Sequence, residues 1–170
     1  MEARAKLFGH PIHQMLIVFP LGLLSTAVIF DLIHLATHEP TWSIVSYWMI
    51  AAGIIGGLCA ALFGVVDWLK IPSATRAYRV GLWHGLGNVC VVVFFAISWL
   101  LRRGDPSNPS GLAILLILIG GALSVVTGWL GGELVNRLGV GVDEGAHLDA
   151  PSSLSGPVAG HETPRASRSR

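Results

Sequence analysis

The sequence predicts an all-α, polytopic membrane protein built as a bundle of four transmembrane helices. Of its 170 residues, 52% are hydrophobic and only 12% are charged, whereas a soluble domain usually carries about 25% charged residues. The mean hydropathy is +0.65. Four apolar runs approach or exceed the ~20 residues that cross a bilayer as a helix, at 14–35, 43–68, 80–101 and 111–135.

The first run differs from a cleaved signal peptide, because it is longer than a signal core and contains Pro20 and Asp31. We expect Pro20 to kink the helix, since proline lacks the backbone N–H. The other runs follow after short polar breaks, at 36–42, 69–79 and 102–110. Together they predict one membrane domain over residues 1–142, with no room for a second folded domain.

Small residues recur every four positions in the last run, at Gly120, Ser124, Gly128 and Gly132. In lipid, such ridges allow the close backbone approach that packs helices together. We therefore expect a tight bundle, and the same ridges leave a homodimer open. Residues 143–170 are rich in Ser, Pro, Gly and Ala and have no apolar period, which predicts a disordered tail.

Basic residues suggest the orientation. Four spans place both termini on one side, together with six basic residues near the helix ends: Arg4, Lys6, Lys70, Arg76, Arg79 and Arg137. The opposite side has Arg102 and Arg103. The positive-inside rule then predicts cytoplasmic termini and a cytoplasmic tail.

Ionisable residues within the spans are costly in lipid and therefore mark candidate sites. Because neighbouring helices run antiparallel, one polar layer is expected at the cytoplasmic level, formed by His10, His13, Asp67, His84 and Glu133. Asn88 lies one turn deeper than His84 on the same face.

Several of these residues also have a simpler interpretation. His10 can cap the first helix ahead of Pro11, Asp67 can be solvated at a helix end, and Glu133 can pair with Arg137. Asp31 and His34 lie three residues apart on one face at the opposite end of the first helix, close to His38, which predicts a second, smaller polar group there.

Three physical options fit the polar layer. His13 and His84 could ligate haem b, with Gly81, Gly85 and Gly87 lining a slot for it. The whole layer, His10, His13, Asp67, His84 and Glu133, could instead hold a transition metal. It could also be a hydrogen-bonded network that only pins the helices together.

Other function classes find no support in the sequence. No nucleophile, zinc-protease, Walker or dinucleotide motif is present, which favours a non-enzymatic role. No basic aromatic surface for nucleic acid is apparent. Cys59 and Cys90 both lie in spans and form no CxxC, so neither a disulfide framework nor a zinc ribbon is expected.

Two motifs carry a family resemblance. Gly-His-Pro-Ile-His-Gln-Met-Leu-Ile-Val-Phe-Pro at 9–20 and Gly-Gly-Glu-Leu-Val at 131–135, followed by Arg-Leu-Gly-Val-Gly-Val at 137–142, resemble a bacterial membrane-protein family called domain of unknown function 2231. The resemblance covers about residues 7–142. It implies a four-span protein of the bacterial inner membrane with undefined activity.

Proteins that resemble this family are sometimes joined to Rieske or c-type cytochrome domains, which implies redox work with a partner protein. The chain departs from the family pattern at Gln14, Asn136 and Leu138, where Pro, Tyr and His are common. Our leading hypothesis is a small redox or metal- or haem-handling membrane subunit. The alternatives are a structural or accessory bundle and a small proton or solute carrier.

Overall fold

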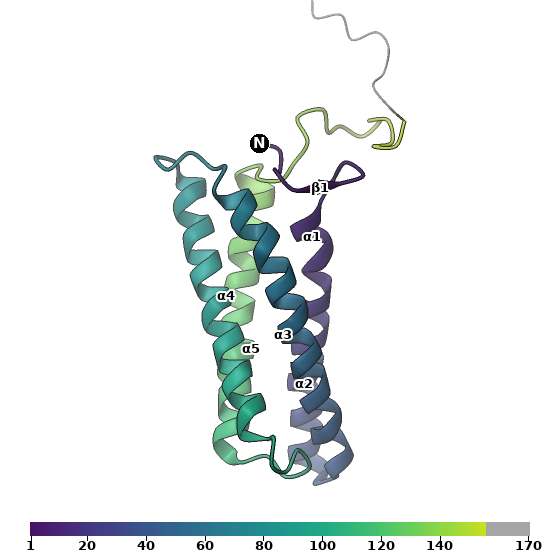
Figure 1. Cartoon of the computed structure of the whole chain (residues 1–170), viewed down its shortest axis with the longest axis vertical. Helices are drawn as coiled ribbons and strands as arrows, with labels where there is room; N and C mark the ends of the chain where they lie inside the picture. The colour runs from purple at the N-terminus through teal and green to yellow at the C-terminus, as the bar shows by residue number, and fades with distance from the viewer. Residues whose placement is uncertain (156–170) are drawn as a thin grey trace, which may run out of the picture.

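The structure, a computed structural model, describes residues 1–155. Four long helices run side by side in an elongated bundle (Figure 1). They are α2 (Val18–Thr37), preceded by the short α1 (Ile12–Leu16), then α3 (Pro40–Trp68), α4 (Arg76–Leu101) and α5 (Gly111–Gly132), which continues as the π-helix η1 (Glu133–Arg137). Figure 1 places the N-terminus at one end of the bundle, named the upper end, and the α4–α5 connection at the lower end.

The predicted all-α membrane fold is confirmed. The described residues contain four helices long and apolar enough to cross a membrane, with mean hydropathies between 1.9 and 2.3. Many large apolar side chains point outward; Val125 is 73% exposed and Leu62 is 69% exposed. Such an exterior suits lipid and would be unfavourable in water.

The bundle consists of two helical hairpins, because α2 packs mainly along α3 and α4 packs mainly along α5. Contacts of α3 with α4, and of α2 with α5, join the hairpins. Six buried residues form the core between them: Leu24, Ala27, Ile50, Val91, Phe95 and Ile117. All four long helices therefore meet in one core.

Local sequence signals set the turns. His38 ends α2 in the left-handed region at φ 57°, and Pro40 then starts α3 at a position where its missing N–H costs nothing. Thr75 caps α4 by accepting a hydrogen bond from the Tyr78 N–H at 3.2 Å. Ser110 caps α5 by accepting one from the Ala113 N–H at 3.3 Å.

The first span is interrupted at Ile17, between α1 and α2. Pro20 lies four residues after Leu16 and cannot donate a hydrogen bond to the Leu16 carbonyl, which accounts for a break at this point. The chain before α1 forms two short antiparallel strands, β1 (Lys6–Leu7) and β2 (His10–Pro11), which the sequence did not predict.

The expected capping role of His10 is wrong. The first helix begins at Ile12, Pro11 occupies the cap position, and no side chain caps it. His10 lies in β2, where its Nε2 is 3.2 Å from the Ser153 hydroxyl. Residues 143–155 contain turns and bends without helix or strand, and the remainder of the predicted tail, 156–170, lies outside the described residues.

The close approach of α2 to α3 at Gly53 can be tested. A Cβ at Gly53 would lie 2.5 Å from Leu24 Cδ2, whereas one at Gly128 would meet nothing within 4 Å. Both substitutions raise helix propensity equally, so the difference between them reports the steric contact. The free energy of unfolding of Gly53→Ala should be lower than that of Gly128→Ala by about 1–3 kcal/mol. Unfolding titrations in detergent measure the difference, and equal stabilities would contradict this packing.

Candidate functional site

The imidazole of His13 is held against α3. Its Nδ1 lies 2.8 Å from the carbonyl oxygen of Ala60. A carbonyl only accepts hydrogen bonds, so in the neutral ring Nδ1 carries the proton and Nε2 the lone pair. A Cβ at Gly64 would lie 2.9 Å from the ring, so glycine at this position allows the ring to rest on α3.

His84 is held against α5 in the same manner. Its Nδ1 lies 2.8 Å from the carbonyl oxygen of Thr127, which again leaves the lone pair on Nε2. A Cβ at Gly131 would lie 3.1 Å from the ring Cε1. Glycine therefore again provides the space in which the ring lies.

The predicted neighbour Asn88 stabilises this arrangement. Its Nδ2 lies 3.4 Å from Nδ1 and 3.3 Å from Nε2 of His84, so the amide is in contact with the ring. The same amide donates to the His84 carbonyl at 2.8 Å, and its oxygen accepts from the Thr127 hydroxyl at 3.1 Å. Asn88 therefore links α4 to α5 and positions His84.

The two histidines face each other between the hairpins. Their ring centroids are 6.4 Å apart and their planes are perpendicular. A metal ion bound to both Nε2 atoms at about 2.0–2.1 Å would hold the centroids about 6 Å apart. Backbone carbonyls on Nδ1 are common outer partners of metal-binding histidines. The separation of the centroids therefore leaves room for one metal ion between the two imidazoles.

The glycines predicted to line a haem slot do not do so. Cβ positions at Gly81 and Gly87 are blocked by Trp68 and Thr127, and Gly85 is exposed with nothing within 4 Å. Two hollows of the described chain lie elsewhere, one beside Phe8, His10 and residues 152–154 and one on α3 between Leu58 and Val65. The three glycines therefore do not line one slot together.

Asp67 does not join the histidines as a ligand. Its Oδ1 accepts hydrogen bonds from the backbone N–H groups of Arg4 at 2.6 Å and Ala5 at 3.0 Å. The carboxylate at the end of α3 thus fixes the segment that precedes β1. The N-terminal segment is fixed further by the Lys70 ammonium, which donates to the Glu2 carbonyl at 3.3 Å.

Glu133 is also engaged elsewhere, because its Oε1 lies 2.7 Å from the Arg76 guanidinium. The predicted pairing of Glu133 with Arg137 is therefore wrong. Glu133 begins η1, and π-helical turns are frequent at functional sites. Here the turn coincides with an ion pair that joins the start of α4 to the end of α5.

The predicted five-residue metal layer is thus not assembled. Among residues 1–155, no three histidine, cysteine, aspartate or glutamate side chains lie close enough to hold a metal ion together. Of the predicted ligands His10, His13, Asp67, His84 and Glu133, the structure brings together His13 and His84.

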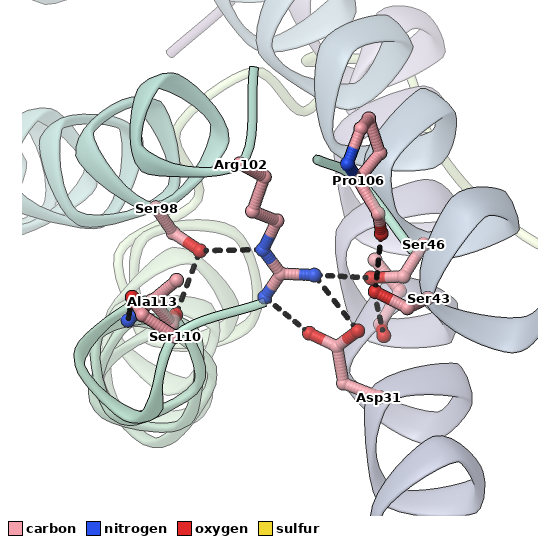
Figure 2. Close-up of polar contacts among 9 residues, drawn as sticks. Asp31, Ser43, Ser46, Ser98, Arg102, Pro106, Ser110 and Ala113 are labelled. Atoms are coloured by element: carbon pink, nitrogen blue, oxygen red, sulfur yellow. Dashed lines mark hydrogen bonds and ion pairs between the residues drawn. The ribbon is translucent and has the colours of Figure 1, made fainter. Parts of the chain in front are cut away.

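A buried ion pair at the lower end was not predicted (Figure 2). Asp31 and Arg102 are 0% and 1% exposed, and two guanidinium nitrogens of Arg102 lie 2.8 and 2.5 Å from the two carboxylate oxygens. The predicted group of Asp31 with His34 and His38 is wrong, because the ring Nδ1 of His34 lies 3.0 Å from the Glu39 carbonyl oxygen instead.

Serine hydroxyls complete this network on all sides (Figure 2). Arg102 Nε donates to Ser98 Oγ at 3.2 Å, and Ser98 donates to the Ala113 carbonyl at 2.7 Å. Ser46 lies 3.5 Å from the guanidinium and donates to the Ala27 carbonyl at 3.1 Å. The network therefore ties α2, α3, α4 and α5 together. The signal in the sequence was one acid near the lower end of the first span and one base directly after the third span.

The described chain is a small polytopic α-helical membrane protein with a buried ion pair and buried serine and threonine side chains inside the bundle. It belongs to the DUF2231 family of predicted membrane proteins, which it matches over residues 9–144. The resemblance seen in the sequence is therefore confirmed. No curated protein and no solved structure is significantly similar to the chain.

The ion pair gives a stability prediction. Asp31→Asn leaves the Arg102 guanidinium buried without a counter-charge, and such a loss costs about 3–5 kcal/mol. The double variant Asp31→Asn/Arg102→Gln removes both charges and should lose less than the single variant. Unfolding in detergent reads out the difference, with the exposed Glu39→Gln as control. Equal losses in single and double variants would show that the charges are not coupled.

Proposed function

We propose that this protein is a metal-handling membrane subunit that binds one transition-metal ion between His13 and His84. The observation that supports the proposal is the opposed pair of imidazoles, 6.4 Å apart between centroids, with both Nδ1 atoms directed to backbone carbonyls. Fixed in this tautomer, each ring has only Nε2 left to donate to a metal. Imidazole suits copper, zinc, iron and nickel.

The charge of the site favours a monovalent ion. The nearby carboxylates Asp67 and Glu133 are occupied by backbone N–H groups and by Arg76, so the two ligands are neutral imidazoles. An ion held there keeps its full charge in a low-dielectric interior, and the cost of burying it rises steeply with that charge. Copper(I), which accepts two nitrogen donors, is therefore the ion that this pair fits best.

The upper end, where this pair lies, is proposed to face the cytoplasm. Basic residues cluster there, and Arg102, which counted against that orientation, is buried in an ion pair. In the described residues, Arg103 is then the one exposed arginine or lysine at the lower end. This strengthens the charge asymmetry on which the positive-inside rule depends.

Metal analysis tests the proposal. Purified protein titrated with copper(I) under reducing conditions should bind one ion per chain, and His13→Ala and His84→Ala should each weaken binding by more than about 100-fold. His34→Ala, at the lower end, is the matched control and should bind normally. A wild-type protein that binds no metal, while His13→Ala and His84→Ala lower only its stability, would overturn the proposal in favour of a structural bundle. A Soret band in protein purified from haem-supplied cells would show that the ligand is haem, and it would overturn the proposal of a single metal ion.

Gly64 provides a second test of the same site. A Cβ at Gly64 would push on the His13 ring from 2.9 Å, whereas one at Gly57 would make an ordinary contact with Pro20 at 3.6 Å. Gly64→Ala should displace the ring from the Ala60 carbonyl and weaken copper(I) binding about 10–100-fold, while Gly57→Ala leaves it unchanged. Equal affinities in both variants would contradict a role for the Ala60 carbonyl in orienting His13.

A further inference from the structure

The two hairpins bury many of the same positions, with Ser43 and Val91 among the exceptions. In α3 and α5, every buried residue of α5 corresponds to a buried residue of α3 at a shift of 67 positions, the separation of Gly53 from Gly120. The buried residues of α3 in this set are Ser46, Tyr47, Ile50, Gly53 and Ala60. Their counterparts in α5 are Ala113, Ile114, Ile117, Gly120 and Thr127.

The first helices of the hairpins follow a second constant shift, of 71 positions. The buried residues of α2 are Leu24, Ala27 and Asp31, and their counterparts Phe95, Ser98 and Arg102 are also buried. The same shift relates His13 to His84. One constant shift therefore relates the second helices of the hairpins, and another relates the first helices.

Contacts inside each hairpin repeat as well. A Cβ at Gly53 would meet Leu24, and a Cβ at its counterpart Gly120 would meet Phe95, the counterpart of Leu24. Eleven residues away, three helical turns, the glycines of both second helices pack against the two histidines. Each hairpin therefore has one apolar contact and one histidine contact at equivalent positions.

The serine hydrogen bonds repeat with donor and acceptor exchanged. Ser46 of the second helix donates to the Ala27 carbonyl of the first helix. In the other hairpin, Ser98 of the first helix donates to the Ala113 carbonyl of the second. Ser98 is the counterpart of Ala27 and Ala113 is the counterpart of Ser46, so the same pair of positions is bridged in both hairpins.

Contacts between the hairpins join positions that are counterparts of one another. His13 faces His84, and Asp31 pairs with Arg102. In a two-fold arrangement a residue meets its own counterpart only close to the axis. Two such contacts, one at each end of the bundle, place a pseudo-two-fold axis along the bundle.

We infer that the protein is a duplicated helical hairpin arranged about this pseudo-two-fold axis, and that its metal site consists of two equivalent half-sites on the axis. Each half-site comprises an imidazole, a backbone carbonyl that accepts its hydrogen bond, and a glycine whose missing side chain leaves space for the ring. They are His13 with Ala60 and Gly64, and His84 with Thr127 and Gly131. Parallel repeats about an axis normal to the membrane also build other membrane proteins.

The ligand class follows from this symmetry and rests on the proposed function. Two equivalent half-sites offer the same donor from opposite sides of the axis. A metal ion that accepts two equal donors matches them. Asp31 and Arg102 break the symmetry at the other end: pairing like hairpins would bring two aspartates or two arginines together, so the pair selects the correct partner hairpin.

Moving one hydroxyl between counterpart positions tests the duplication without metal. Ser46→Ala should lower the unfolding midpoint. Ala27→Ser/Ser46→Ala, which copies the geometry of Ser98 and Ala113, should recover at least half of that loss. The control Ala36→Ser/Ser46→Ala adds a hydroxyl at an exposed position of the same helix and should recover none. Equal midpoints for the two double variants would overturn the duplication.

Copper(I) titration of the two single-histidine variants tests the half-sites. His13→Ala and His84→Ala should retain equal residual affinities, within about threefold, and the same one-imidazole signature in X-ray absorption, because either half-site alone offers the same donor. A variant that loses all binding while the other keeps wild-type affinity would overturn their equivalence. A wild type without metal would instead refute the proposed function, and the hydroxyl test would still decide the duplication.

Discussion

The buried pair of Asp31 and Arg102 constrains the whole bundle, because neither charge can stay in the membrane interior without the other. The pair fixes the depth of α2 relative to α4, and the serines around it bring α3 and α5 to the same level. Because helices are rigid, helices that are held at one level at the lower end also lie at matching levels at the upper end. There, the imidazoles of His13 and His84 meet across the bundle.

Glycine sets the distance between helices at the candidate site. The space left by Gly64 and Gly131 is filled by imidazole rings, each close enough to bond to a helix carbonyl. In lipid, where apolar burial contributes little to helix association, this close contact together with a polar bond is a principal source of stability. The same contacts that pack the helices therefore also fix the tautomer on which the proposed metal binding depends.

Hydropathy was sufficient to predict the four spans, since length and composition alone decide whether a helix can cross a bilayer. Counting residues along antiparallel helices also placed His13, His84, Asp67 and Glu133 near one level. It could not give the rotation of each helix about its own axis, so it did not show that Asp67 turns to the N-terminal segment and Glu133 to Arg76. The sequence alone places Arg102 among the basic residues outside the spans, because its partner Asp31 is distant in sequence.

The separation of 71 residues between Asp31 and Arg102 also matters during synthesis. Asp31 belongs to the first hairpin, which is synthesised before Arg102. Until then the nascent chain has to keep this carboxyl protonated, hydrated or shielded by the translocation machinery. The first hairpin is therefore an incomplete intermediate, and arrival of the arginine converts it into a committed fold. A stalled or truncated chain would expose an unneutralised acid that membrane quality control can recognise.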